Sequence, residues 1–194
     1  MRWNALILLC CFLLAVGAGC KKRETPKPVP KTNSELGHAL TNVCQLITTE
    51  EIGAVQGSPI KEPQGSTRSE NGFRVSQCFY TAAEFSKSVN LALVQRDPDH
   101  SSGRSPKDFW KEKFDPYENE EPQKDSDGEK EKGPPPKKIA SLGDEAYWAS
   151  NRFGGTLYVL KGDAFISVGL GGTDDQETKL KKSKALAQKA LQRL

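Results

Sequence analysis

The chain has 194 residues with 28 Lys and Arg against 25 Asp and Glu, a formal net charge of +3. Subtracting a leader and a short tether leaves about 160 residues, the size of one domain with a single core. A charge this small, without a basic stripe interleaved with aromatic residues, excludes a dedicated nucleic-acid binder.

The first 19 residues have the organisation of an export signal. Arg2 is followed by an apolar run over residues 5–16 and by three small residues before Cys20. The run is shorter than the about 20 apolar residues of a transmembrane helix. This pattern resembles a bacterial lipoprotein signal, in which a diacylglycerol is attached to the cysteine and the peptide is cut before it. The resemblance implies that residues 1–19 are removed and that Cys20 becomes a lipidated N-terminus.

Residues 20–34 have the composition of a tether. Pro26, Pro28 and Pro30 alternate with lysines, and no apolar periodicity is present. We expect an extended, polyproline-like chain here. Its cations lie next to the predicted lipid, where anionic headgroups would attract them, although a simple soluble spacer fits the composition equally well.

The five cysteines fit an exported protein. Cys10 and Cys11 leave with the signal and Cys20 takes the lipid, so Cys44 and Cys78 remain for the domain. In an oxidising compartment this pair is expected to form a disulfide. The alternative is two buried free thiols, because cysteine is often buried without a partner.

The predicted domain covers residues 35–194, and its first half begins with helices. Apolar spacing predicts a helix from Glu35 through Val43. A second helix is expected after Thr48, whose hydroxyl and the Glu51 carboxylate form a capping box, and Gly57 ends it. The polar residues 61–72 indicate a loop. Strands are expected at 73–81 and 88–95 because apolar residues alternate there.

The second half begins with a helix that Ser105 caps. Residues 117–138 contain acidic residues, lysines and prolines but hardly an apolar side chain, so we expect a disordered surface insertion at about 117–138. Three antiparallel strands follow at 146–149, 156–160 and 164–170. A final helix, capped by Thr173 or Asp174, should bury one stripe. The stripe consists of Leu180, Ala187, Leu191 and Leu194.

This order of elements predicts an α+β fold, an antiparallel sheet with helices packed on one face. Residues 78–81 and 146–149 are similar tetrads that are each followed by a hairpin, which suggests two related halves.

Several motifs together resemble a known group. They are Cys44-x-Leu46-Ile47-Thr48-x-Glu50-Glu51-Ile52, Gly57-x-Pro59, Cys78-x-Tyr80, Leu142-Gly143-Asp144-x-Ala146 and Lys161-Gly162-Asp163. These residues look like those of small bacterial lipoproteins of unknown function, best known from actinobacteria. The fold of that group resembles extracellular sensor domains of actinobacterial receptor kinases, which implies an antiparallel sheet with a groove. The motifs are mainly structural and bring no catalytic residue with them.

Few residues are candidates for chemistry. His38 and His100 are the two histidines, and neither accompanies a nucleophile in a recognisable motif, so a catalytic triad lacks its parts. Asp97, Asp99 and Asp108 have the approximate spacing of a calcium loop, but the required glycine is misplaced. We therefore expect no catalytic residue, no metal and no cofactor.

Two further patterns admit a binding role and a structural one. Gly169-x-Gly171-Gly172 could hold a phosphate between strand and helix, but Asp174 and Asp175 favour helix capping there. Large aromatic side chains could line a ligand groove, although core packing is commoner in a small domain. These side chains are Trp110, Tyr147, Trp148 and Phe153.

The sequence therefore favours a lipid-anchored binding or sensing module of the cell envelope over an enzyme. The membrane would hold it through the lipid on Cys20, on the outer membrane if the cell has one. Its partner would be an envelope protein or a small ligand, not a nucleic acid. The alternative is an envelope hydrolase that uses a pair of carboxylates.

Overall fold

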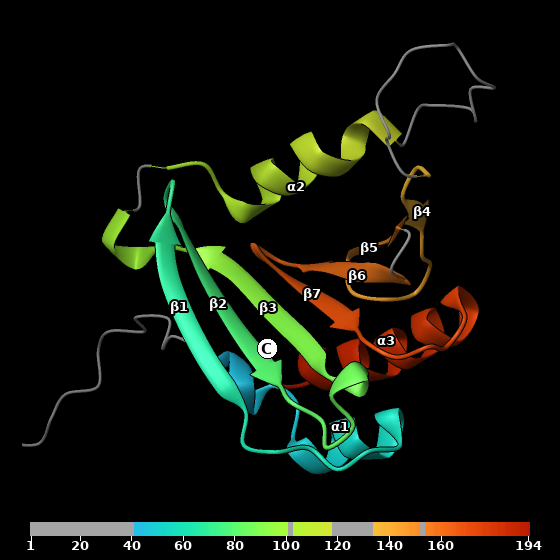
Figure 1. Ribbon diagram of the computed structural model, residues 1–194. Coiled ribbons are helices and arrows are strands. Elements are labelled where there is room, and N and C mark those ends of the chain that lie inside the picture. The colour runs from blue at the N-terminus through green and yellow to red at the C-terminus, as the bar shows by residue number, and fades with distance from the viewer. Residues whose placement is uncertain (1–40, 101–102, 118–133, 152–153) are drawn as a thin grey trace, which may run out of the picture. The chain divides into compact units, whose positions relative to one another are not determined.

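The protein is built around one seven-stranded antiparallel sheet with strand order β1-β2-β3-β7-β6-β5-β4 (Figure 1). The computed structural model describes residues 41–100, 103–117, 134–151 and 154–194. The strands are β1 Gln64–Glu70, β2 Phe73–Tyr80, β3 Val89–Arg96, β4 Lys137–Lys138, β5 Glu145–Asn151, β6 Gly154–Lys161 and β7 Ala164–Leu170. The helices are α1 Thr49–Gln56, α2 Pro106–Phe114 and α3 Gln176–Leu191, with short 3-10 turns between them. The predicted α+β class is confirmed.

Two three-stranded meanders form most of the sheet. Strands β1, β2 and β3 follow one another, as do β5, β6 and β7, and the meanders join where β3 pairs with β7. The tetrad 78–81 begins in β2, the middle strand of the first meander. The similar tetrad 146–149 lies in β5, the first strand of the second meander. They therefore occupy different places in the two halves of the sheet.

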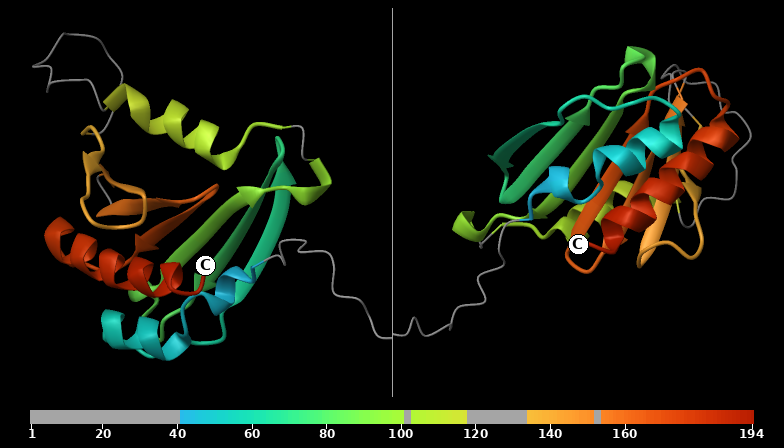
Figure 2. Two further views of the ribbon diagram at one scale, coloured as in Figure 1. Left: turned by 180° about the vertical axis from the view of Figure 1, so that it is seen from behind. Right: turned by 90° about the horizontal axis from the view of Figure 1, so that it is seen from below.

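The larger core lies between the sheet and the helices α1 and α3. These helices lie side by side on one face (Figure 2), and α3 lies against β6 and β7. Every second residue along the strands points to this face, and Leu91, Val168 and Leu157 are examples that are fully buried. The expected arrangement of helices on one face holds for these two helices.

Helix α2 packs on the opposite face, which the sequence did not indicate. Trp110 and Phe114 are each 1% exposed and pack against Tyr147, Leu160 and Phe165. The Phe114 and Tyr147 rings are stacked with centroids 4.5 Å apart. Where α2 packs, β5, β6 and β7 therefore carry apolar side chains on both faces of the sheet. The sheet is a central layer at this end of the strands.

Strand β1 replaces part of the loop that was expected over residues 61–72. All seven residues of β1 are exposed, so neither face selects apolar side chains and the alternation that marks a strand is missing. The strand forms because it pairs with β2 along its whole length. Asn71 and Gly72, with φ of 52° and 82°, make the two-residue turn. Asn-Gly is the strongest short hairpin signal and was the clue in the sequence.

The predicted disulfide is present. Cys44, in the 3-10 turn Val43–Gln45, is bonded to Cys78 in β2 with a Cα–Cα distance of 5.2 Å. On the neighbouring strand Gly65 faces the bond, and a Cβ there would lie 3.3 Å from the Cys44 Sγ. The bond joins the start of the domain to the centre of the first meander.

The remaining boundaries follow the sequence with some corrections. Helix α1 has the expected Thr48 capping box and the expected left-handed Gly57 at its end. Helix α3 is capped by Asp175, not by Thr173 or Asp174, and its fully buried positions include Leu186 and Ala190. Of the predicted stripe, Ala187 is buried, whereas Leu180, Leu191 and Leu194 are half-buried.

The predicted insertion ends earlier than expected. Lys137 and Lys138 form β4, which pairs with Trp148 and Tyr147 of β5. Residues 118–133 of the insertion lie outside the described residues, as do the signal, the tether, Cys20 and the start of the first predicted helix. Among the helices in the described ranges, none is long and apolar enough to cross a membrane.

Glu51 fastens α1 to the end of α3. Arg193 donates to both carboxylate oxygens at 2.8 and 2.9 Å, and Lys189 donates at 3.1 Å. The Thr48 amide donates to the same carboxylate at 3.0 Å. The Arg193 hydrogen bonds are the main cause that lowers the pKa of Glu51 to about 2. The carboxylate side chain is 19% exposed, so this pair is better shielded than an ordinary surface ion pair.

Replacing Glu51 by Gln is expected to lower the free energy of unfolding at pH 7 by about 2 kcal/mol, because about 1.4 kcal/mol corresponds to each pKa unit and surface screening reduces the total. The folded pKa lies below the ordinary value of 4.5. The contribution is therefore complete above pH 4.5 and is lost as the pH falls toward 2. Urea denaturation at pH 7 and pH 3 measures it, with the exposed Glu62→Gln as control. A difference between Glu51→Gln and the native protein that does not shrink at pH 3 would contradict this origin.

Candidate functional site

The sheet face that carries α2 is only partly covered. The α2 aromatic side chains sit on Phe165, Leu160 and Tyr147, toward one end of the strands. The other end of the same face is lined by small and polar side chains that remain accessible, and we call it the open face. Its residues are Gln77 and Phe79 of β2, Asn90 of β3, Ser167 of β7 and Thr156 of β6.

Strand pairing places these side chains side by side. Phe79 is directly opposite Asn90, and Asn90 is opposite Gly169 on the next strand. Gly169 in turn is opposite Thr156. The glycine leaves the backbone of β7 open between the Asn90 amide and the Thr156 hydroxyl. The open face thus offers hydrogen-bonding side chains on four neighbouring strands, β2, β3, β7 and β6.

An exposed aromatic pair stands at the border of the open face. Phe79 is 38% exposed and Phe85 is 70% exposed, and their ring centroids are 6.4 Å apart. Together with Tyr117 these are the large apolar side chains exposed in the described part of the chain. Two exposed aromatic rings keep apolar surface in contact with water, which is unfavourable unless a partner covers it. Aromatic side chains are enriched at protein interfaces.

The segment that carries Phe85 is held in place from both sides. Ser88 Oγ donates to the Phe85 carbonyl at 2.6 Å, and the Gly171 amide donates to the Ser88 carbonyl at 2.9 Å. A Cβ on Gly171 would lie 2.0 Å from the Ser86 carbonyl oxygen. Glycine is therefore required at 171 for the close approach of two backbones. Phe85 is thereby presented on a fixed loop beside Phe79 of β2, which lowers the conformational entropy lost on binding.

The same contacts decide the role of the glycine motif at residues 169–172. The Gly171 amide is bonded within the protein, and the Asp175 carboxylate accepts from the Thr178 amide at 2.7 Å at the start of α3. The structural interpretation of this motif is therefore the correct one, and these groups are not available to hold a phosphate.

The candidate calcium residues have other partners. Arg74 donates to Asp97 at 3.3 Å and to Asp99 at 3.2 Å, so one guanidinium lies between both carboxylates. Asp108 accepts from the Ser105 amide in the capping box of α2. The described residues contain no group of three or more His, Cys, Asp or Glu side chains that could hold a metal ion.

Three of the four candidate aromatic residues belong to the core. Trp110 and Tyr147 are 1% exposed under α2, and Trp148 is 5% exposed on the other face. Trp148 lies so close to β6 that a Cβ on Gly155 would be 2.3 Å from its ring. Phe153, His38 and the side chain of His100 lie outside the described residues.

Several carboxyl groups of the described residues are stabilised as anions. Hydrogen bonds lower the pKa of Asp144, through the Gly162 amide, and of Asp108 and Asp175 at helix starts. The Asp144 carboxylate accepts from the Gly162 amide at 2.7 Å and so fixes the β6–β7 turn. This contact explains why the motifs Leu142-Gly143-Asp144 and Lys161-Gly162-Asp163 occur together. These motif residues support the fold.

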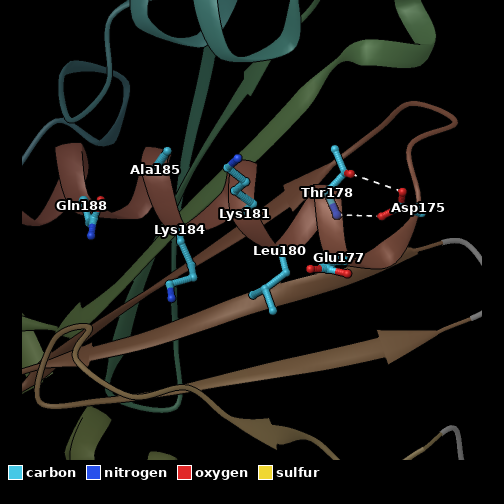
Figure 3. A pocket seen from close by; sticks show the side chains of 8 residues that line it. All are labelled: Asp175, Glu177, Thr178, Leu180, Lys181, Lys184, Ala185 and Gln188. Atoms are coloured by element: carbon cyan, nitrogen blue, oxygen red, sulfur yellow. Dashed lines mark hydrogen bonds between the residues drawn. The ribbon is translucent and has the colours of Figure 1, made fainter.

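A shallow depression of about 660 Å³ runs along the outer side of α3 (Figure 3). Its lining comes from α3 and its cap alone: Asp175, Glu177, Thr178, Leu180, Lys181, Lys184, Ala185 and Gln188. No residue of another helix or strand belongs to this lining, and the Asp175 carboxylate caps α3. The depression is thus a charged helix surface with both signs present.

Sequence reasoning missed Phe79, Phe85 and the open face. Phe79 was read as part of a strand, which is correct, but the sequence does not tell which strand residues a helix will cover. Phe85 did carry a signal, as a single aromatic residue in an otherwise polar connection.

Comparison with known proteins found no matching family model, no matching curated protein and no matching solved structure.

Proposed function

We propose that the protein is a membrane-anchored binding or sensing module of the bacterial cell envelope, and that it binds through the open face. The observation that carries this proposal is the exposed Phe79–Phe85 pair, with Phe79 on β2 and Phe85 on a fixed loop, beside the hydrogen-bonding side chains of four strands. Rigid aromatic anchors with a polar surround have the composition of a recognition surface.

The anchor is part of the proposal. The apolar run, the small residues before Cys20 and the Pro/Lys tether support a lipid on Cys20, and the resemblance to small envelope lipoproteins supports the same localisation. An outer membrane is the proposed location if the cell has one. Such an anchor and tether would keep the open face at a limited distance from the membrane surface.

Binding is favoured over the carboxylate-dependent hydrolase by the carboxyl groups themselves. A general acid requires a raised pKa. The pKa is lowered, not raised, at six carboxyl groups of the described residues, namely Glu50, Glu51, Glu84, Asp108, Asp144 and Asp175. The partners of these carboxylates are backbone amides, hydroxyls and cations that maintain the fold.

The chemistry of the open face limits the partner. Phe79 and Phe85 require an apolar group, and Asn90 and Gln77 offer both donors and acceptors to amide or hydroxyl groups. A protein segment of the envelope or a small ligand with an apolar part satisfies both. A nucleic acid does not, because none of these side chains carries a positive charge.

Cross-linking in native envelopes tests the proposal. A photoreactive phenylalanine analogue at position 85 is expected to form a reproducible adduct, because this ring is the most exposed of the pair. The same analogue at Gln188 on α3 is the matched control, and no adduct is expected there. An adduct at Gln188 would indicate binding at the depression along α3. Cys20→Ala should move the protein from the membrane to the soluble fraction and remove the adduct with a membrane-bound partner.

The outcomes distinguish the two functions. Adducts at 85 and not at 188 support recognition by the open face, and Phe79→Ala should then weaken them. Equal adducts at both positions, or none, together with hydrolysis of an envelope substrate that is lost on neutralising one carboxylate, would establish the enzyme instead.

A further inference from the structure

The two edges of the sheet are protected to very different degrees. At one edge β4 has two residues, both lysines, and short lysine-bearing edge strands are a common defence against strand addition. At the other edge β1 has seven exposed residues without lysine or proline. Its seven consecutive pairs with β2 contain no bulge that would twist it away. β1 thus lacks the shortness and the lysines of the opposite edge, and its charged residues, Arg68 and Glu70, are paired with each other.

The β1 hairpin determines which backbone groups face outward. Asn71 and Gly72 form a two-residue turn, so Glu70 and Phe73 are the closing hydrogen-bonded pair. Alternate residues back from Glu70 then bond to β2, and Gly65, Thr67 and Ser69 direct their N–H and C=O away from the sheet. The side chains of these three residues are small, so they would not themselves hinder a further strand.

We propose that two copies of the chain associate by antiparallel pairing of their β1 strands around a two-fold axis at Thr67. This register places Thr67 opposite Thr67 of the second copy, and Gly65 opposite Ser69. Each outward pair would exchange two backbone hydrogen bonds. The result is one continuous sheet through both molecules.

The side chains of β1 are compatible with this occupant. In the two-fold register Arg68 is opposite Ser66 of the second copy, and Glu70 is opposite Gln64, so no charge is directly opposite a like charge. Arg68 is moreover paired with Glu70 on its own strand at 3.4 Å. The facing threonines are a favourable cross-strand pair. The two Arg68 side chains lie diagonally across the axis, but each is paired with Glu70 of its own strand, so β1 can pair with itself in this register.

The dimer is expected to be weak. Pairing along one seven-residue strand buries less than the roughly 1,200–2,000 Å² of stable interfaces. Confinement of the proposed lipid anchor to a membrane would raise the local concentration and favour pairing. The proposal itself rests on β1 alone and does not require the open face to bind a ligand.

Cysteine cross-linking of the full chain in detergent tests the register. Directly opposed residues of a hydrogen-bonded pair have Cα atoms about 5.5 Å apart, within reach of a disulfide. Thr67→Cys should therefore give a covalent dimer under mild oxidation, about tenfold more than Ser66→Cys alone, whose equivalent residue lies diagonally. A mixture of Ser66→Cys and Arg68→Cys chains should cross-link, because these positions face each other.

Added proline supplies a second readout. Ser69→Pro removes an outward N–H and leaves the pairing with β2 intact, so it should lower the cross-link in the Ser66/Arg68 mixture several-fold while the near-UV circular dichroism is unchanged. The proposal is overturned if Thr67→Cys gives no dimer or no more than Ser66→Cys. It is also overturned if the cysteine at 67 is captured by a different protein, which would make β1 a site for a foreign strand. Phe85→Ala should leave the cross-link unaffected, because Phe85 lies outside β1 and β2.

Discussion

Replacing Cys44 by Ser is expected to lower the free energy of unfolding by about 3–4 kcal/mol. The bond to Cys78 closes a loop with a sequence separation of 34 residues, so its removal returns substantial chain entropy to the unfolded state. In the folded state Cys78 is fully buried, and the loss would leave an unpaired thiol in the core. Urea denaturation of the oxidised proteins measures the difference.

The matched controls use the same bond. Cys78→Ser and the double variant Cys44→Ser/Cys78→Ser should be destabilised to a similar extent, because all three lose one cross-link. Reduction of the native protein should bring it to the same level. A Cys44→Ser variant within 1 kcal/mol of the native protein would show that the cross-link contributes little.

Replacing Trp110 by Ala is expected to lower the free energy of unfolding by about 3–5 kcal/mol. The ring is 1% exposed, and its centroid lies 4.5 Å from that of Phe114 and 5.8 Å from that of Phe165. Its Nε1 donates to Glu145 at 3.0 Å. Because this small cluster is what holds α2 on the sheet, the amides of α2 should lose protection in hydrogen exchange.

Two variants separate packing from the hydrogen bond. Trp110→Phe keeps most of the apolar contact and loses the bond to Glu145, so a cost of about 1–2 kcal/mol is expected. Lys111→Ala, at an exposed position of the same helix, should change the stability by less than about 0.5 kcal/mol. If Trp110→Ala were no more damaging than Trp110→Phe, packing under α2 would not be what stabilises this helix.

Local signals in the sequence determined much of the fold. The Thr48–Glu51 capping box and Gly57 define α1 because these contacts are made within a few residues of one another. Alternating apolar residues predicted β3, since every second residue, such as Val89, Leu91 and Leu93, enters the larger core. The disulfide followed from elimination among five cysteines. Each of these inferences depends on short-range chemistry or on counting.

Only the tertiary structure decided the features that matter for recognition. β1 forms through pairing with β2 rather than through burial, so its composition resembled a loop. Whether α2 covers one face or the other depends on which apolar strand residues are left over after α1 and α3 have packed, and a helix pattern does not identify its partner. The open face and the exposed Phe79 result from that choice. Coverage of a sheet is a property of long-range packing, and for that reason the sequence by itself determined the elements of this protein but not its candidate binding surface.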